Sequence, residues 1–347
     1  MRLGICLKAC IKIVRARCIY DNAFKQRNDY FIVDDRQPVI NFMNENNKIK
    51  CKKSVSTFDF STLYTSIPQT QLKANIKQFI ERAFTIKNKK YAIINNKKVY
   101  FCDSKRKVKE NEICLDKDNL IKCLYFIIDN AYIFHKGVLY RQIIGIPMGN
   151  NAGPHLANIY LHIYEFNYIE HLWHSNVDPK ILLKLIDIFR FQDDLIVFND
   201  DGHLQTILKE IYPQEMVVNN TNISPRKCSY LDLMISVFQG KFLFRLFDKR
   251  LSFNFKVISY PFLCGNIPKT ASYGVFTSQL NRFCEVNCKF EHFLNDVNAL
   301  TRKLCDQGFE HSELSRRFDR FYHSQMKLWS KFGKNLMGYK NTLLRIT

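Results

Sequence analysis

Apolar residues recur along this chain with two different periods. Short runs with alternating or continuous apolar positions predict strands, and longer stretches with apolar residues every three to four positions predict helices. Residues 55–63 predict a buried strand entering a turn, and residues 69–86 predict a helix. An Asn-Asn pair at residues 95–96 lies between two apolar runs and predicts a β-hairpin.

The middle of the chain continues this mixture of elements. We expect a helix over residues 120–132 and a short strand over residues 138–144. Pro154 marks the start of another helix, because proline is tolerated in a first helical turn. Residues 189–198 carry apolar positions around two adjacent aspartates, which predicts a β-hairpin with the acids at its bend.

The last third changes from strands to helices. Residues 228–258 alternate as further strands, with Gln239 and Gly240 as a turn. From Ser278 onward the spacing is helical and the composition basic. The whole pattern therefore predicts an α+β fold in which a sheet-containing body precedes a helical region.

The composition fits a globular protein with a polyanionic partner. At 347 residues and 46% hydrophobic residues, the chain can bury a large core in about two to three domains or subdomains. Its formal net charge of +20 favours nucleic acid first and an acidic membrane surface second, with a solvated lysine-rich surface as the alternative. Residues 87–112 form a basic insertion with nine Lys/Arg against three acids, which suits a nucleic-acid contact or a solvated loop.

The cysteines and the N-terminal segment carry weaker signals. The twelve cysteines lack Cys-x-x-Cys spacing and no secretory signal precedes them, so we expect reduced, mostly buried thiols. Cys284, Cys288 and His292 have the spacing of one helix face. Such a face could form a metal site or a thiol-lined part of the core. The first twenty residues are basic without an acid, which fits a mitochondrial presequence or a helix on a phosphate backbone. No apolar stretch reaches the roughly 20 residues that span a bilayer.

Three aspartates in apolar surroundings carry the candidate chemistry. Asp59 stands in one apolar run, and Asp193 and Asp194 stand together in another. Burial of unpaired carboxylates costs several kcal/mol unless cations compensate, which favours metal binding over a solvated turn. Two divalent ions can clamp the attacking and leaving oxygens of a phosphoryl transfer, and Mg²⁺ prefers carboxylate oxygens. The peptide carbonyl of Phe60 offers a further hard oxygen ligand.

A Gly/Pro loop lies between these acids in the sequence. Residues 145–149 read Gly-Ile-Pro-Met-Gly and precede the helix predicted at Pro154. Glycines lack Cβ, so this backbone can approach a base or sugar closely. Met148 is unbranched and suited to pack on a base. Asn150 and Asn151 are candidates for template phosphate contacts or for capping the helix.

In this order the motifs resemble the reverse transcriptases of Penelope-like retroelements, from about Phe31 to the C-terminus. The matching blocks are Asp59 to Pro68, Tyr140 to Gln142, Gly145 to Gly149 with Pro154, Arg190 to Leu195, Ser229 to Leu233, Asp248 to Arg250, Phe253 to Phe255, Asn266 to Pro268, Ala271 to Val275 and Ser278 to Leu280. The resemblance implies a right-hand polymerase palm, with an antiparallel sheet backed by helices, and a helical thumb. It also implies two Mg²⁺ or Mn²⁺ ions, a primer on an RNA or DNA template, and dNTP substrates.

The resemblance assigns a role to each candidate site residue. Asp59 and Asp193 would bridge both metals, with Asp194 as a supporting third acid and the Phe60 carbonyl as a ligand. Lys227, or Arg226 in its place, would protonate or neutralise the leaving pyrophosphate. The remaining roles are sugar selection by Tyr64 unless it is a core residue, nucleotide binding by Pro147, Met148 and Gly149, and nucleic-acid binding by Asn150, Asn151, Arg316, Arg317 and Arg320.

The resemblance also divides the chain into three regions. Residues 1–50 would be a basic remnant or replacement of the fingers, residues 51–260 the palm, and residues 261–347 a basic thumb-like region. Because the resemblance implies shortened fingers, the alternative is a decayed or repurposed copy that binds nucleic acid without polymerising. We expect an intracellular protein, nuclear or cytoplasmic, with no membrane partner. No segment resembles the GIY-YIG endonuclease of this family, so integration is not expected of this sequence.

Overall fold

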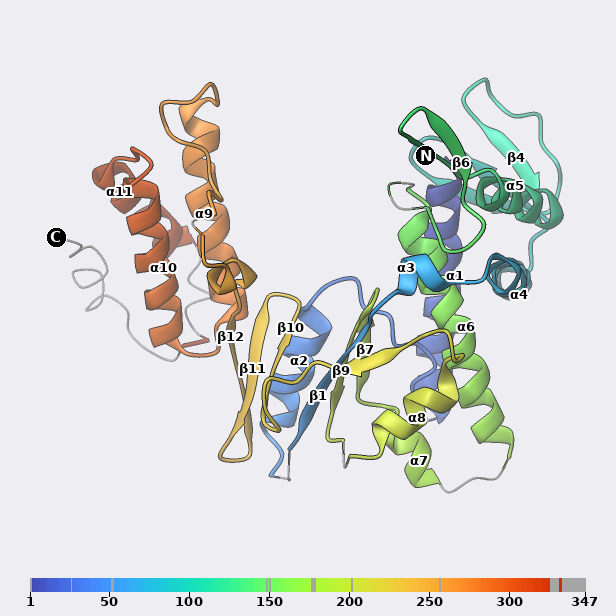
Figure 1. Ribbon diagram of the computed structural model, residues 1–347, viewed down its shortest axis with the longest axis horizontal. Helices are drawn as coiled ribbons and strands as arrows, with labels where there is room; N and C mark the ends of the chain where they lie inside the picture. Colours follow the sequence, from blue (N-terminus) through green and yellow to red (C-terminus); the bar gives the residue numbers. More distant parts are fainter. Residues whose placement is uncertain are drawn as a thin grey trace. The chain divides into compact units, whose positions relative to one another are not determined.

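The structure, a computed structural model, consists of two compact units (Figure 1). It describes residues 2–25, 27–50, 53–147, 149, 151–175, 179–200, 202–255, 257–324 and 331–332. The first unit joins residues 1–35 to residues 54–222, and the second joins residues 36–53 to residues 223–347. Both combine antiparallel strands with helices, so the predicted α+β class is confirmed. The boundaries predicted at residues 50 and 260 concern functional regions and stay predictions.

The first unit contains most of the elements of the chain. Its helices are α1 (Arg2–Lys25), α3 (Leu63–Ser66), α4 (Gln69–Lys87), α5 (Lys117–Asp129), α6 (Gly153–His174), α7 (Pro179–Lys184) and α8 (Leu204–Ile211). Its strands are β1 (Val55–Phe60), β2 (Tyr91–Ile94), β3 (Val99–Cys102), β4 (Ile113–Asp116), β5 (Tyr132–His135), β6 (Val138–Arg141), β7 (Ile188–Phe191), β8 (Asp194–Phe198) and β9 (Val218–Asn220).

A four-stranded antiparallel sheet in the order β7-β8-β1-β9 organises this unit. Phe58 of β1 lies opposite Leu195 of β8, and both are buried in the core with α6 and α8. Asp59 lies one residue further along β1, so its side chain points to the other face of the sheet. The predicted strand is confirmed as far as Phe60. The hairpin predicted at residues 189–198 is confirmed as β7 and β8, but Asp194 lies in β8 rather than at the bend with Asp193.

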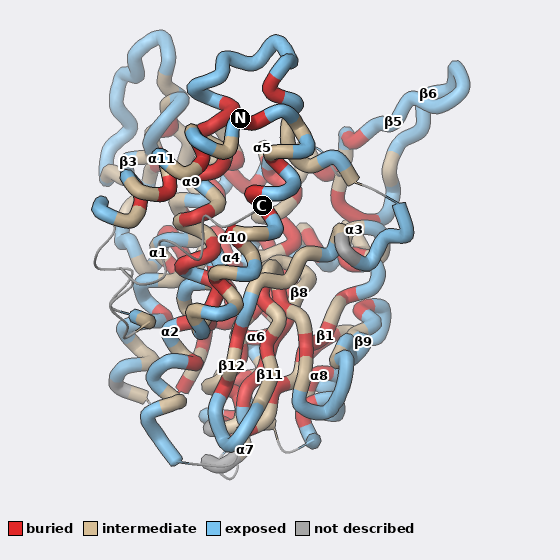
Figure 2. Tube along the Cα trace, turned by 90° about the vertical axis from the view of Figure 1, so that its left-hand side faces the viewer, coloured by how far each residue is buried: buried red, intermediate tan, exposed pale blue. Residues whose placement is uncertain are grey.

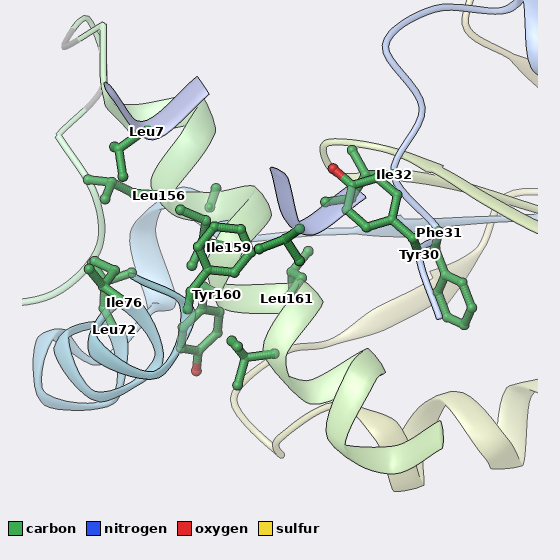
Figure 3. Close-up of a cluster of buried hydrophobic side chains, with 14 of the residues drawn as sticks. Leu7, Tyr30, Phe31, Ile32, Leu72, Ile76, Leu156, Ile159, Tyr160 and Leu161 are labelled. Carbon is green, nitrogen blue, oxygen red and sulfur yellow. The ribbon is translucent and has the colours of Figure 1, made fainter. Parts of the chain in front are cut away.

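Helices α1, α4 and α6 meet in the same core. Leu7 of α1 lies beside Leu156 of α6, and Leu72 and Ile76 of α4 face Tyr160 (Figure 3). All of these side chains are buried, so the first helix of the chain is integral to the first unit. The helix predicted at 69–86 is confirmed as α4, and Pro154 lies in the first turn of α6 as predicted.

The basic insertion forms a small sheet in the order β3-β2-β4. The predicted hairpin at Asn95 and Asn96 is confirmed, with Ile94 opposite Val99. The Asn95 side chain accepts hydrogen bonds from the backbone N–H groups of Lys97 and Lys98, which fixes the turn.

The helix predicted at residues 120–132 is shifted toward the N-terminus. It begins as α5 after Asp116, whose side chain accepts a hydrogen bond from the backbone N–H of Asn119. It ends at Asp129 because its buried apolar stripe ends at Ile128. Tyr132 therefore opens strand β5, and the single strand predicted at 138–144 is the second strand of a hairpin with it.

The second unit contains the remaining elements. They are α2 (Gln37–Asn46), β10 (Lys227–Tyr230), β11 (Leu233–Phe238), β12 (Lys241–Leu246), the 3-10 turn η1 (Lys249–Ser252), α9 (Lys269–Val286), α10 (Phe290–Cys305) and α11 (His311–Ser324). The predicted turn at Gln239 and Gly240 is confirmed, with φ values of 48° and 70°. Strands predicted to residue 258 end at Leu246, because Asp248 caps the following turn by accepting from the backbone N–H of Arg250.

Helices α9, α10 and α11 share a separate apolar core. Cys284 lies on α9, Cys288 lies in the connection after it, and His292 lies on α10, so the expectation of one helix face is wrong. Cys284 is buried in the core, and the Cys288 sulfur accepts a hydrogen bond from the backbone N–H of Phe244. This arrangement matches the thiol-lined core rather than a metal site. In the described part of the chain, no helix has the length and apolar character needed to cross a membrane.

Candidate active site

The central sheet of the first unit brings two of the predicted aspartates side by side. Asp59 of β1 lies directly opposite Asp194 of β8, and Asn219 of β9 lies opposite Asp59 on its other side. Directly opposed residues of an antiparallel ladder point to the same face. Asp194, Asp59 and Asn219 therefore form a polar row on the sheet face opposite the helical core. Sequence reasoning missed Asn219, because nothing near it marks a pairing with β1.

Asp193 occupies the tight turn that joins β7 to β8. Gln192 in the same turn has a φ of 54°, the left-handed conformation that a two-residue hairpin needs. The backbone N–H of Phe60 donates to the Asp193 carbonyl at 3.3 Å. This bond ties the bend to the end of β1, so all three aspartates lie at one end of the same strand pair.

A fully buried arginine holds the turn from the core side. Arg190 of β7 donates through Nε and Nη2 to the two carboxylate oxygens of Glu165 on α6, at 2.6 and 3.2 Å. Its Nη1 donates to Asn158 Oδ1 at 2.8 Å and to the backbone carbonyl of Gln192 at 2.9 Å. The side chain that anchors the sheet to α6 thus also fixes the carbonyl beside Asp193.

The electrostatics of this network favour the ion pair. Burial opposes the charge on Arg190, but the adjacent Glu165 carboxylate raises the pKa of the guanidinium overall. The Tyr212 hydroxyl donates to Glu165 at 2.7 Å, and burial, followed by the Glu165 charge, raises the pKa of this phenol. In the sequence, the only signal for this network is Glu165 standing among apolar residues of the helix that follows Pro154.

Tyr64 lies between the core and the aspartate turn. Its ring is half-buried against the core, and its hydroxyl donates to Gln192 Oε1 at 3.2 Å. Burial, followed by the nearby charge of Asp193, raises the pKa of the Tyr64 hydroxyl. The sequence left two positions open for Tyr64, in the core or beside the site. The ring lies against the core and the hydroxyl lies beside the aspartate turn, so the side chain combines both positions.

The Gly/Pro loop packs against the backbone of Tyr64. The N–H of Ile146 donates to the Tyr64 carbonyl at 2.7 Å, and the N–H of Gly145 donates to the Ile67 carbonyl at 2.8 Å. Gly145 has a φ of +82°, and an added Cβ would lie 2.4 Å from the Tyr64 carbonyl oxygen. This glycine is therefore needed for close packing within the protein.

The remaining loop candidates are more dispersed. Pro147 is partly buried and Gly149 is exposed, whereas Met148 and Asn150 lie outside the described residues. Asn151 is exposed, and its backbone lies near Gly4 of α1. Helix α6 has Ala152 as its N-cap without a side-chain cap hydrogen bond, so Asn151 does not cap it.

The other predicted site residues belong to the second unit. Lys227 opens β10, and its role in catalysis stays a prediction. On α11, Arg316 and Arg320 are exposed. Arg317 pairs with Glu313 at 2.9 Å and lies over the Tyr273 ring, so it contributes to packing within this unit.

A metal ion bound at the aspartates would need further ligands from substrate or water. Within the described residues, no three His, Cys, Asp or Glu side chains form a self-sufficient metal cluster. Mg²⁺ is usually held by one or two carboxylates together with substrate phosphates and water. The carboxylate pair on the sheet face and the acid in the adjoining turn are residues of the type that such a site uses.

Comparisons with known proteins identify the fold. No family model matches the chain, and no curated protein gives a significant match. Telomerase from Candida albicans, solved in complex with a TWJ fragment of telomeric RNA, matches with a TM-score of 0.60 at 14% identity, covering 99% of this chain and 55% of that chain. Apo telomerase from Candida tropicalis matches with a TM-score of 0.45 at 15% identity, covering 98% of this chain and 58% of that chain. The chain therefore spans a little over half the length of these telomerases, and the first match shows a right-hand polymerase fold of the reverse-transcriptase type.

Proposed function

We propose that this protein is an RNA-directed DNA polymerase of a retroelement, of the Penelope-like type. The proposal rests on the placement of Asp59 opposite Asp194, with Asp193 in the adjoining turn, within a right-hand polymerase fold. The ordered sequence motifs support the finer assignment to Penelope-like elements. Such an enzyme works where its template and dNTPs are found, in the nucleus or the cytoplasm.

The three aspartates are the proposed metal ligands. Asp59 and Asp193 would hold two Mg²⁺ or Mn²⁺ ions, with Asp194 and the carbonyl of Phe60 in support. When bound, the ions stabilise the charge on the attacking and leaving oxygens of nucleotidyl transfer. Arg190 holds the Gln192 carbonyl and so positions the turn that presents Asp193.

Other side chains act on the nucleotide in this proposal. Tyr64, whose hydroxyl donates to Gln192, would meet the sugar of the incoming nucleotide and exclude a 2′-hydroxyl. Lys227 donates a proton to the leaving pyrophosphate, a type of assistance typically worth about 10²–10⁴-fold in rate. Pro147, Met148 and Gly149 would bind the nucleotide.

A nucleic-acid partner follows from the charge and from the fold. The net charge of +20 suits a primer–template, and the Candida albicans telomerase was solved with an RNA fragment. Asn150 and Asn151 would face the template, and Arg316 and Arg320 would contact duplex phosphates from an exposed face of α11. Arg317, given the same role from the sequence, would support that face through Glu313 and Tyr273.

Primer extension with dNTPs and Mg²⁺ or Mn²⁺, on RNA and DNA templates, tests this function. Asp59→Asn and Asp193→Asn should each lower extension by roughly 10³-fold, because several kcal/mol of transition-state stabilisation depends on the ions. Glu45→Gln is the control, since Glu45 is a surface acid paired with Lys48. Primer–template affinity should stay within about twofold in all three variants, because the phosphate contacts are unchanged.

Two outcomes would count against the proposal. Unchanged extension by Asp59→Asn and Asp193→Asn would remove the aspartates from the chemistry. A wild-type protein that binds primer–template but extends it with neither ion would be a nucleic-acid-binding protein, the alternative reading of the sequence.

A further inference from the structure

The hairpin of β5 and β6, residues 132–141, is an arm with unusually exposed apolar side chains. Every residue of both strands is exposed, including Phe134 at 73% and Tyr132 at 51%. Figure 2 shows this hairpin extending outward beyond α3 of the same unit, exposed along its length. A two-stranded hairpin is marginally stable by itself in water, and exposed apolar patches of this kind mark interaction sites.

The pairing of the strands separates two faces of the arm. Tyr132 lies opposite Arg141, and Phe134 lies opposite Leu139, so these four side chains share one face. We call this the stacking face. The opposite face is formed by Ile133, His135, Val138 and Tyr140. Two aromatic rings therefore stand two residues apart on the stacking face, about 6.6–6.8 Å along the strand, with an arginine across from one of them.

The base of the arm is fixed to the candidate active site. The N–H of Gln142 donates to the Ala131 carbonyl at 2.8 Å, and the Gln69 side chain donates to the Gln142 carbonyl at 3.1 Å. Ile144 bridges to Pro68, and the next residues bond to the backbone around Tyr64. The arm therefore begins at the loop that packs on Tyr64, which is itself bonded to the aspartate turn.

The charge on the arm identifies the chemistry of its partner. His135, Lys136 and Arg141 are its ionisable residues apart from Tyr132 and Tyr140, and no acid occurs between residues 130 and 164. A partner that is purely apolar would gain nothing from this one-sided positive charge. A polyanion with flat apolar groups, which is the chemistry of a single nucleic-acid strand, complements both the charge and the rings.

We propose that the stacking face of the arm binds the bases of a single-stranded nucleic acid, with Arg141 and Lys136 at its phosphates. Sheets that present aromatic rings on one face stack two or three unpaired bases in this way. This inference rests on the proposed function and makes the occupant the unpaired part of the template, near the aspartate turn. Duplex bases are already stacked on each other, so the arm discriminates single strands from duplex.

The direct test is fluorescence anisotropy of the full chain with labelled oligouridine and with a labelled blunt duplex. Tyr132→Ala/Phe134→Ala should lower affinity for oligouridine by about 25-fold or more, since each of the two lost base–aromatic stacks is worth roughly 5- to 150-fold. Affinity for the duplex should stay within about twofold. The matched control is Ile133→Ala/Val138→Ala on the opposite face, which should leave both affinities unchanged. Tyr132→Trp/Phe134→Trp should retain single-strand binding, because it preserves both stacking rings.

Three results would overturn the inference. Equal loss of oligouridine affinity in the variants of the two faces would show that the arm does not bind bases by stacking on one face. Unchanged oligouridine binding in Tyr132→Ala/Phe134→Ala would remove nucleic acid from this face. Sedimentation that shows self-association of the wild type, lost in this variant while oligouridine binding persists, would make a second copy of the chain the occupant.

Primer extension separates failure of this inference from failure of the proposed function. The Tyr132→Ala/Phe134→Ala variant should extend a primer by one nucleotide normally but should lose synthesis on a long single-stranded template. Normal synthesis on the long template would reject the arm and leave the polymerase intact. If the wild type extends no primer but shows the selective loss of oligouridine binding, the polymerase proposal fails and the single-strand site stands.

Discussion

Two hairpins of the first unit have similar local sequences but lie in opposite environments. Both β5–β6 and β7–β8 have a four-residue first strand rich in apolar residues and a two-residue bend with a left-handed residue. Yet β5–β6 is exposed throughout, whereas β8 is buried from Leu195 to Phe198. The difference lies in their neighbours: β8 pairs with β1 as well as β7, and α6 covers one face of that sheet.

The comparison suggests why the two hairpins suit different tasks. Metal ligands must be held in one geometry, and the β7–β8 bend is fixed by Arg190 from the core and by Phe60 from β1. A surface that stacks bases of any sequence needs exposed rings and tolerates adjustment. Substitutions in the β7–β8 hairpin are thus expected to lower the stability of the protein. Substitutions in the β5–β6 hairpin are expected to leave stability unchanged but to weaken nucleic-acid binding.

Replacement of Arg190 by Met should produce the largest change in stability. It leaves the Glu165 carboxylate buried without its cation, and breaking a buried pair in this way costs about 3–5 kcal/mol. Urea unfolding monitored by circular dichroism measures this cost. Extension activity should also fall by roughly 10²-fold, since displacing a catalytic group by about 1 Å has an effect of that size.

The double variant Arg190→Met/Glu165→Gln distinguishes stability from positioning. It removes the buried charge and keeps an acceptor for Tyr212, so stability should recover by about half. The Gln192 carbonyl still lacks its donor, so activity should stay low. Full recovery of activity together with stability would show that Arg190 supports the fold without positioning the aspartate turn.

Two glycines with matched backbone geometry compare the bend of the β5–β6 hairpin with the loop at its base. Gly137 in the β5–β6 bend has a φ of +81° with no atom within 4 Å of an added Cβ, and Gly145 has a φ of +82° with the Tyr64 carbonyl oxygen at 2.4 Å. Gly137→Ala should cost about 1–2 kcal/mol from the left-handed backbone alone. Gly145→Ala should cost roughly 2–5 kcal/mol, because overpacking adds to the same strain.

Equal urea midpoints for the two glycine variants would contradict this interpretation. Such a result would mean that the loop at Gly145 moves away from Tyr64 at little cost. Primer extension provides a second measurement, because displacement of the loop should lower activity in Gly145→Ala and leave single-nucleotide addition by Gly137→Ala unchanged.

Much of the fold and part of the candidate site could be predicted from the sequence. The strand at Asp59 and the hairpin at Asp193 and Asp194 carry local signals, namely apolar runs interrupted by acids, and both were predicted correctly. Helix α4 and the hairpin at Asn95 also follow from local periodicity and turn chemistry. These elements could be located because neighbouring residues determine them.

The interactions between distant segments could not be predicted in this way. Asn219 reaches the site through strand pairing with β1, and Glu165 reaches Arg190 because α6 crosses the sheet. The β5–β6 hairpin was mistaken for the end of a helix and one strand, since its apolar residues resemble those of a buried element. Period alone does not distinguish apolar residues that are buried from those that are exposed for binding.

The smallest predicted effect concerns pH and the core behind the anchored hairpin. His162 of α6 is fully buried, with the Tyr30 and Phe79 rings at centroid distances of 5.1 and 5.8 Å. Burial, followed by the charges of Arg82 and Arg190, lowers the pKa of this imidazole well below its ordinary value. The folded protein therefore holds His162 neutral, while in the unfolded chain it binds a proton near pH 6.5.

Acidification should therefore destabilise the first unit through His162. The unfolded state takes up the proton first as pH falls through 6.5, so the contribution is fully present at higher pH and declines below that value. Between pH 7 and pH 5.5 the loss should be about 1 kcal/mol, or roughly 2 °C in melting temperature. His162→Phe should flatten this dependence, because it keeps an aromatic ring beside Tyr30 and Phe79 and removes the titrating group. His171→Gln is the control, since His171 is also on α6 but is exposed. An unchanged dependence of stability on pH in His162→Phe would show that the acid sensitivity comes from other groups than His162.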